Sequence, residues 1–225
     1  MHIVQVGMEY DVLKENNKIA NSNYRLLKEN GIKTIELMGS IGSGKTALVI
    51  KLAERARQKG LRACAIAGDV AGDDDQRRMK ESGLDAINCN TGHECHLDAN
   101  LVRKSLEKID LDKYDVIFIE NVGNLVCPAE FDTGAIKNAM ILSVPEGDDK
   151  PLKYPLMFSV CDVLLVNKID AMPVFDFDIG LCEERAKKLN PDIKAIPISA
   201  KTGEGIAEWA GWLRGEVESF RAGNA

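Results

Sequence analysis

The 225-residue sequence contains no apolar run that approaches the roughly 20 residues needed to cross a membrane. Its first residues also lack a basic segment leading into an apolar core, which is the pattern of a secretory signal. We therefore expect a cytoplasmic location and no membrane partner. Internal repeats, low-complexity tracts and domain linkers are absent as well, which favours one α/β unit.

A surplus of positive charge is missing too. The formal net charge is −6 at pH 7, with 29 Lys and Arg against 35 Asp and Glu. Because basic patches are the electrostatic footprint of nucleic-acid binding, this balance argues against nucleic acid as the main partner. Hydrophobic residues make up 45% of the chain and charged residues 28%, and these shares fit a globular protein.

The six cysteines contain no C-x-x-C pair. In a cytosolic protein they are expected to be thiols or metal ligands and not disulfides. Cys64, Cys89 and Cys161 fall in strand-like runs, where we expect core positions. Cys182 falls in a helical run and has no partner nearby in sequence.

The strongest motif is a phosphate-binding loop. Residues 39–46 (GSIGSGKT) fit G-x-x-x-x-G-K-[ST] at every fixed position, between a strand-like and a helical run. This context aims backbone N–H groups and a helix N-terminus at an anion. Lys45 would contact the β- and γ-phosphates, and the Thr46 hydroxyl would bind Mg²⁺. The residues expected to contact the nucleotide here are Gly39, Ser40, Gly42, Ser43, Gly44, Lys45 and Thr46.

A second motif indicates guanine as the base. The apolar run 162–166 ends in Asn167, Lys168 and, two residues on, Asp170, which form the N-K-x-D pattern. Guanine presents two adjacent donors that one carboxylate accepts, whereas adenine would leave that carboxylate unpaired. The stem of Lys168 can lie along the base while its charge stays in water. We therefore expect GTP and GDP as the bound nucleotides.

A weaker signal follows the strand-like run 196–198. The next residues, Ser199, Ala200 and Lys201, resemble the loop that contacts the guanine carbonyl in GTPases. Alone this segment would carry little weight, but it agrees with the N-K-x-D motif.

Acidic residues at strand ends indicate a Mg²⁺ site. The run 114–119 ends in Glu120, with Gly123 three residues on, where common GTPases carry Asp-x-x-Gly. An acid at this place holds Mg²⁺ or orients the attacking water, and the Gly123 N–H contacts the γ-phosphate. Asp69 and Asp75 are further Mg²⁺ candidates. We expect Lys45, Asp75 and Glu120 to be the catalytic residues.

For Asp73, Asp74 and also Asp75, the alternative is a helix N-terminus rich in carboxylates, which the helix dipole favours without any metal.

Cysteine and histidine stand side by side at Cys95 and His96, and a further thiol follows at Cys127. Adjacent residues point apart on a regular helix, so the pair converges on one ion only at a loop-to-helix junction. Thiolate and imidazole suit Zn²⁺ or Ni²⁺. The residues alone leave packing as an alternative for this pair, and they leave open whether His93 is a ligand.

The remaining pattern predicts a mostly parallel sheet flanked by helices. An amphipathic helix from Glu9 to Asn30 comes first, and we divide the chain into an N-terminal helical extension (1–31) and a GTPase domain (32–225). This helix either covers the sheet or serves a partner. Strands are expected near 33–38, 61–67, 84–89, 114–120, 138–144, 162–167 and 193–198, and further helices near 45–59, 74–82, 97–109, 150–159, 178–189 and 204–220.

Together these motifs resemble the HypB family, GTPases that help insert nickel into nickel–iron hydrogenase. Besides the two nucleotide motifs, the resemblance rests on residues 95–99 (CHLDA), 120–125 (ENVGNL), 127–129 (CPA) and 151–155 (PLKYP), and it covers nearly the whole chain. It implies a P-loop fold of the SIMIBI class. It also implies a metal site for Ni²⁺ or Zn²⁺, near a dimer interface, formed by Cys95, His96 and Cys127.

The resemblance implies three partners as well: a second copy in a GTP-dependent homodimer, the nickel chaperone HypA and the hydrogenase large-subunit precursor. Many relatives begin with a C-x-x-C-G-C segment, and some carry a histidine-rich stretch. Here no cysteine precedes Cys64 and the chain has three histidines, so we do not expect nickel storage. No arginine finger can be assigned, so we expect slow intrinsic turnover.

Three alternatives stay open. The urease accessory GTPase UreG carries Cys-Pro-His, whereas Ala129 follows Cys127 and Pro128 in this chain. A GTPase chaperone of a cobalamin enzyme would share the nucleotide motifs but lack the Cys/His set. A metal-buffering protein, in which nucleotide only regulates assembly, would show no GTP turnover.

Overall fold

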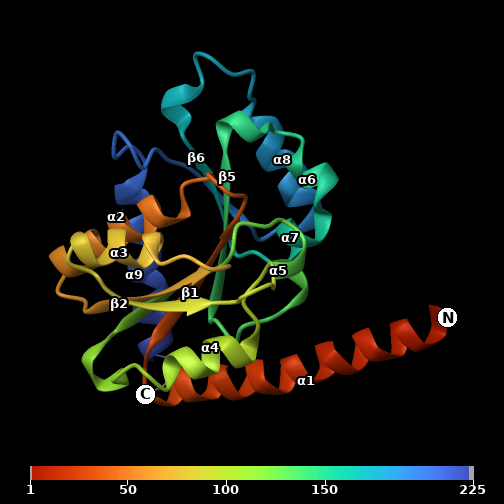
Figure 1. Cartoon of the computed structure of the whole chain (residues 1–225). Helices are drawn as coiled ribbons and strands as arrows, with labels where there is room; N and C mark the ends of the chain where they lie inside the picture. Colours follow the sequence, from red (N-terminus) through yellow and green to blue (C-terminus); the bar gives the residue numbers. More distant parts are fainter. Residues whose placement is uncertain (1, 223–225) are drawn as a thin grey trace.

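Seven parallel strands form the sheet within residues 2–222, the part of the chain that the computed structural model describes. Their order is β3-β2-β4-β1-β5-β6-β7, and every pairing is parallel. The predicted parallel α/β sheet is confirmed, and Figure 1 shows helices on both of its faces. The strands are β1 (Lys33–Gly39), β2 (Ala63–Asp69), β3 (Asp85–Asn90), β4 (Val116–Glu120), β5 (Lys137–Ser143), β6 (Val163–Asn167) and β7 (Lys194–Pro197).

Helices connect these strands. They are α1 (His2–Glu29), α2 (Lys45–Gln58), α3 (Asp74–Glu81), α4 (Ala99–Leu106), α5 (Cys127–Glu130), α6 (Lys150–Lys153), α7 (Pro155–Ser159), α8 (Ile179–Leu189) and α9 (Ile206–Ala222), with short 3-10 turns η1 (Leu111–Lys113), η2 (Val144–Glu146) and η3 (Ile169–Ala171). None of the helices in the described part of the chain has the length and hydrophobicity that a membrane span requires.

Burial on both faces explains why the strands read as continuous apolar runs. Successive side chains of a strand point to opposite faces. In β1, Ile35 and Leu37 join the core beneath α2 and α9, where Trp209 is fully buried. Met38 joins the opposite core beneath α7 and α8. The helices cover the two faces of the sheet, and the candidate site lies at the carboxyl ends of the strands.

The long helix α1 lies along α4 and extends beyond it toward the N-terminus (Figure 1). Ala20 and Leu27 of α1 are fully buried, and Leu27 packs in one core cluster with residues of β2 and β4, so this end of α1 covers the sheet. The helix begins at His2, earlier than the predicted Glu9, and ends close to the predicted place. The division of the chain at residue 31 stays a prediction.

One predicted element and the placement of one residue are wrong in detail. The helix expected over 150–159 is split into α6 and α7, because Pro155 disfavours the helical conformation at Tyr154, whose φ and ψ are −129° and 57°. Cys161 is buried as expected but precedes β6 and lies outside the strand. The short α5 was not predicted. The other boundaries shift by no more than a few residues.

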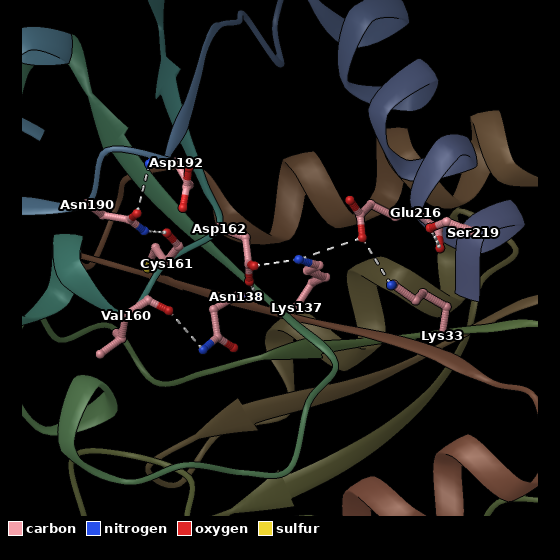
Figure 2. Close-up of polar contacts among 10 residues, drawn as sticks. All are labelled: Lys33, Lys137, Asn138, Val160, Cys161, Asp162, Asn190, Asp192, Glu216 and Ser219. Carbon is pink, nitrogen blue, oxygen red and sulfur yellow. Dashed lines mark hydrogen bonds and ion pairs between the residues drawn. The ribbon is translucent and has the colours of Figure 1, made fainter. Parts of the chain in front are cut away.

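The amino ends of the strands are tied to α9 by ion pairs, which Figure 2 shows. Lys33 Nζ lies 3.1 Å from Glu216 Oε2, and Lys137 Nζ lies 2.6 Å from Asp162 Oδ1 and 3.8 Å from the same glutamate. Lys33 Nζ also lies 5.0 Å from the centre of the Phe220 ring. Burial lowers the pKa of Lys33, and Glu216 opposes that shift. This end of the sheet is therefore structural, opposite the motif-bearing end.

Candidate nucleotide and metal site

A cavity of about 450 Å³ opens at the carboxyl ends of β1, β2 and β4. Parallel strands end at the same edge, so the loops that follow them converge there. The walls come from the phosphate loop, the end of β2, the start of α3 and the segment after β4. They are Ile41, Gly42, Gly44, Lys45, Thr46, Ala47, Gly68, Asp69, Val70, Asp75, Arg78, Glu120, Asn121, Val122 and Gly123.

The phosphate loop needs glycine for close backbone approach. A Cβ on Gly39 would lie 2.4 Å from the Ile141 carbonyl oxygen, and one on Gly44 would lie 2.3 Å from Asn167 Nδ2. Both glycines also have positive φ, which other residues rarely adopt. Within the turn, the Ser43 N–H donates to the Ser40 carbonyl at 3.2 Å. The loop therefore packs closely against the ends of β5 and β6.

Lys45 and two acids meet at the start of α2. The Lys45 ammonium donates to the carbonyl oxygens of Gly39 and Ser40 at 3.1 and 3.0 Å. Burial lowers the pKa of Lys45, and the negative charges of Glu120 and Asp75 oppose this shift. The amino group thus lies over the loop that is expected to hold phosphates.

The Thr46 hydroxyl brings the predicted Mg²⁺ acids together. Its Oγ1 lies 2.8 Å from Asp75 Oδ1 and 2.8 Å from Glu120 Oε1. The other oxygen of Glu120, Oε2, is buried and has no hydrogen-bond partner among the described residues. Burial is the main cause that raises the pKa of Glu120 to about 7, and the negative charge of Asp75 adds to the shift. This cluster of oxygens has the chemistry of a site for a hard divalent cation.

The other candidate acids lie differently. Asp69 lines the cavity, but its Oδ1 accepts the Val70 N–H at 2.6 Å and no bond joins it to Thr46 among the described contacts. Asp73 and Asp74 lie at the N-terminus of α3 and form ion pairs with Arg77, so their placement agrees with the helix-end alternative.

The predicted base-binding residues lie against the phosphate loop. Asn167 Nδ2 donates to the Ser43 carbonyl at 2.8 Å. Lys168 Nζ donates to the Gly42 carbonyl at 2.6 Å, and its backbone has φ 63°. These contacts join the end of β6 to the loop after β1. The two nucleotide motifs therefore form one continuous surface.

Ser199, Ala200 and Lys201 complete this surface from the end of β7. The Ser199 hydroxyl donates to Asp170 Oδ1 at 2.6 Å, and the Ala200 N–H donates to Asn167 Oδ1 at 3.1 Å. Lys201 Nζ lies 3.8 Å from Asp170 Oδ2 and is mostly exposed. The carboxylate of Asp170 is thereby held in one orientation.

The three predicted metal ligands converge. Cys95 Sγ lies 3.0 Å from Cys127 Sγ and 4.0 Å from His96 Nδ1, and all three ligand atoms lie within 4.8 Å of one another. Cys95 precedes α4 in an irregular loop, and Cys127 begins α5. Adjacent Cys and His point to one place here because their segment is not helical. His93 is exposed and lies outside this group.

Burial favours the neutral, metal-ligating form of the His96 imidazole. His96 is 8% exposed and stacks on Phe131, with ring centres 4.0 Å apart. Burial lowers its pKa, which favours the neutral form that ligates metals. Cys95 raises the pKa of the Cys127 thiol, mainly through their hydrogen bond. A bound cation would offset the repulsion between the thiolates of Cys95 and Cys127.

The segment from Glu120 to Cys127 joins the two sites. A Cβ on Gly123 would lie 2.4 Å from Ile41 Cγ1 and 2.8 Å from its backbone nitrogen, so this glycine packs directly on the phosphate loop. Asn124 Nδ2 donates to the Cys95 carbonyl at 3.4 Å. Nucleotide and metal residues are therefore neighbours along the chain and in space.

The sequence patterns did not assign a role to Asn121, Glu36 or Arg78. Asn121 and Glu36 are buried and hydrogen-bonded to each other. Arg78 lines the cavity, and its Nη1 lies 3.3 Å from Asp75 Oδ1. One signal was present, since Glu36 is a charged residue inside the apolar run of β1.

Comparisons with known proteins agree with this geometry. The profile of the family described as CobW/HypB/UreG, nucleotide-binding domain, matches residues 33–197. A probable hydrogenase maturation factor HypB of Methanocaldococcus jannaschii is 45% identical over 222 residues, which cover 98% of this chain and 100% of that protein.

Two solved structures are similar throughout. The hydrogenase maturation factor HypB of Archaeoglobus fulgidus has a TM-score of 0.83 and 38% identity, covering 91% of this chain and 99% of its own. HypB of Helicobacter pylori, in complex with nickel, has a TM-score of 0.86 and 33% identity, covering 91% and 96%. The P-loop fold predicted from the sequence is confirmed by these likenesses.

Proposed function

The chain belongs to the HypB family of hydrogenase maturation factors, and from this we propose that it hydrolyses GTP while assisting nickel insertion into nickel–iron hydrogenase. The reaction would convert GTP and water into GDP and phosphate. The relatives named above carry the name HypB, which favours this function over the UreG and cobalamin-chaperone alternatives. The nickel complex of the Helicobacter pylori relative supports nickel as the cargo.

We propose that GTP binds across the surface formed by both nucleotide motifs. The phosphates would be bound by backbone N–H groups of residues 39–46 and by Lys45, and Gly123 would contact the γ-phosphate. Asp170, oriented by Ser199, would accept both guanine donors. Asn167, Lys168, Ala200 and Lys201 would complete the base site.

The oxygen cluster around Thr46 fits Mg²⁺, because Glu120 Oε2 is buried without a partner in the described part of the chain and Asp75 also contacts Thr46. Mg²⁺, when bound, would neutralise charge on the β- and γ-phosphates. Thr46, Asp75 and Glu120 would hold the ion, with Asp69 contributing from the cavity wall. Glu120 would also orient the attacking water.

Cys95, His96 and Cys127 would bind nickel in transit, and the same ligands also suit Zn²⁺. Three protein ligands leave a four-coordinate ion with one open position, where a ligand from a partner can enter. This arrangement supports transfer and not permanent storage.

The single observation that carries the proposal is the segment between Glu120 and Cys127. It begins beside Thr46, packs at Gly123 on the phosphate loop and ends at a metal ligand. Loss of the γ-phosphate would release this segment, as in other GTPase switches. The metal ligand Cys127 would then change position, so that hydrolysis would give nickel transfer a direction.

We propose a GTP-dependent homodimer, the nickel chaperone HypA and the hydrogenase large-subunit precursor as partners. Ile41 and Val126, beside the two sites, are apolar and 85% and 50% exposed, which supports an interface at this end. Slow intrinsic turnover and a cytoplasmic location stay predictions from the sequence.

A turnover assay combined with nickel titration tests the proposed function. The native protein should hydrolyse GTP and not ATP, and should bind nickel with the Cys/His group. His96→Gln should lose this nickel, whereas His93→Gln, an exposed neighbour outside the group, should keep it. Absence of GTP turnover would favour the metal-buffering alternative. Nickel retained by His96→Gln would reject the ligand assignment.

A further inference from the structure

Asn121 connects a segment of each site through one amide oxygen. It is fully buried and lies between Glu120 and Val122, which line the nucleotide cavity. Its Oδ1 accepts the Leu97 N–H at 2.9 Å and the Val122 N–H at 2.8 Å. Leu97 directly follows the metal ligand His96. The same acceptor therefore holds the backbone of the γ-phosphate-facing segment and the backbone of the metal segment.

The amide nitrogen of Asn121 is anchored to the centre of the sheet. Its Nδ2 donates to Glu36 Oε1 at 2.5 Å, and Glu36 Oε2 accepts the Thr133 hydroxyl at 2.5 Å. All three side chains are 2% exposed or less. Glu36 belongs to β1, which leads into the phosphate loop. Because the Nδ2 group is fixed in this way, Oδ1 cannot turn away from its two donors without breaking a buried hydrogen bond.

Packing on β2 reinforces this connection. A Cβ on Gly68 would lie 2.7 Å from the Glu120 carbonyl oxygen and 2.8 Å from Leu97 Cδ1. Glu120 and Leu97 therefore both pack closely on the backbone of Gly68, which has no side chain. Leu97 is fully buried and packs closely on Gly68, so an independent movement would disturb a packed interior.

We propose that Asn121 is a positioning residue that couples the nucleotide state to the nickel site, an inference that rests on the proposed function. When the segment after Glu120 shifts, Leu97 and the adjacent His96 must shift with it. Otherwise the Leu97 N–H, which is bonded to Oδ1, is left without an acceptor, which is unfavourable in the interior. The imidazole would thus follow the γ-phosphate as directly as Cys127 does.

Two variants separate the acceptor at position 121 from its surroundings. Asn121→Ala removes the acceptor. Asn121→Asp combined with Glu36→Gln keeps an acceptor for both N–H groups, conserves net charge and reverses only the bond between the two side chains, since Gln donates to Asp. Thr133→Val is the matched control, because it removes a bond to Glu36 without touching Oδ1.

The measurement is the ratio of Ni²⁺ dissociation constants between GDP-loaded protein and protein loaded with a non-hydrolysable GTP analogue. A coupled native protein should give a ratio that differs from one by about 5- to 150-fold. Asn121→Ala should bring the ratio to within about twofold of one, whereas the double variant and Thr133→Val should keep the native ratio. An unchanged ratio in Asn121→Ala, or a lost ratio in the double variant, overturns the role of Asn121.

Amide hydrogen exchange in the native protein gives an independent readout, which stands even where Asn121→Ala does not fold. The Leu97 and Val122 amides should change protection together when the analogue replaces GDP, with no metal present. A change at Val122 without one at Leu97 overturns the inference. A native nickel ratio of one, by contrast, rejects the coupling in the proposed function itself.

Discussion

The Thr46 hydroxyl gathers two carboxylates that would repel each other in isolation. Asp75 and Glu120 both approach its Oγ1 at 2.8 Å, while Lys45 supplies a compensating positive charge. Burial keeps the pKa of Glu120 near 7, so this residue is partly protonated at neutral pH. The residues proposed for catalysis thus depend on one another, and their substitutions should not be additive.

Glu120 should give GTP hydrolysis an acid limb. Only the carboxylate form binds Mg²⁺, so kcat/KM for Mg²⁺–GTP, which reports the free protein, should fall as pH drops below about 7, the pKa that burial and Asp75 give to Glu120 in the metal-free site. Glu120→Gln should bind GTP, hydrolyse it poorly and lack this limb. Steady-state kcat/KM measured against pH in both proteins checks the prediction. Native turnover by Glu120→Gln would show that Glu120 neither holds Mg²⁺ nor orients water.

Asp170→Asn should change base preference. The amide replaces one carboxylate oxygen with a donor, which suits xanthine because an oxygen takes the place of the guanine 2-amino group. We expect GTP affinity to fall at least about 100-fold and xanthosine triphosphate to bind better. Calorimetric titration tests this, with the exposed Asp176→Asn as control. Equal binding of GTP and ATP by the native protein would contradict the assignment.

Among the elements, the segment from Glu120 to α5 is the one that the proposed switch requires to move. Gly123→Ala should prevent its approach to the phosphate loop, because a Cβ there meets backbone atoms of Ile41. We expect affinity for a GTP analogue to fall about tenfold or more, with GDP affinity much less affected. Gly211→Ala, on α9 with open space around its Cβ, is the matched control. Equal losses for both nucleotides would contradict a role in sensing the γ-phosphate.

The elements were predictable from sequence wherever burial set a long apolar run or a motif fixed a turn. The strand before the phosphate loop and the one before N-K-x-D are examples, since both are buried on two faces. α5 was not predictable, because a single turn from Cys127 to Glu130 carries no periodicity. The split at Pro155 was readable in principle from the restriction that proline places on the preceding residue.

The site was partly predictable for the same reason. Motifs at strand ends placed Thr46 and Glu120 at one edge of a parallel sheet, where they meet. Their spacing could not reveal the contact between Asn121 and Leu97, since that contact depends on how two irregular loops pack. The role of Glu36 was not predicted, because an acidic residue within a strand pattern does not indicate which buried side chains it contacts.

For the whole molecule, a buried carboxyl should make stability depend on pH. Burial raises the pKa of Glu36 to about 7, whereas an unfolded glutamate titrates near 4.5. Between these values the folded state binds more protons, so this group's contribution to stability is full at acid pH and declines as pH rises. The decline between pH 4.5 and 7 should reach at most about 3 kcal/mol.

Glu36→Gln isolates this contribution, because the other titrating groups, His96 and Glu120 among them, are present in both proteins. Relative to the native protein, the variant should gain unfolding free energy as pH rises from 5 to 7.5. Denaturant unfolding without nucleotide at the two pH values measures the difference. Parallel pH dependence in both proteins would show that Glu36 does not retain its proton in the fold.

The central claim for the molecule is that one chain segment makes nickel binding depend on the bound nucleotide. Ni²⁺ titration of native protein, loaded with GDP and with a non-hydrolysable GTP analogue at equal Mg²⁺, tests it most directly. Nickel affinities should differ by at least about fivefold, and nickel should alter the affinity ratio of the two nucleotides by the same factor. Identical nickel affinity and stoichiometry in both states would contradict the account.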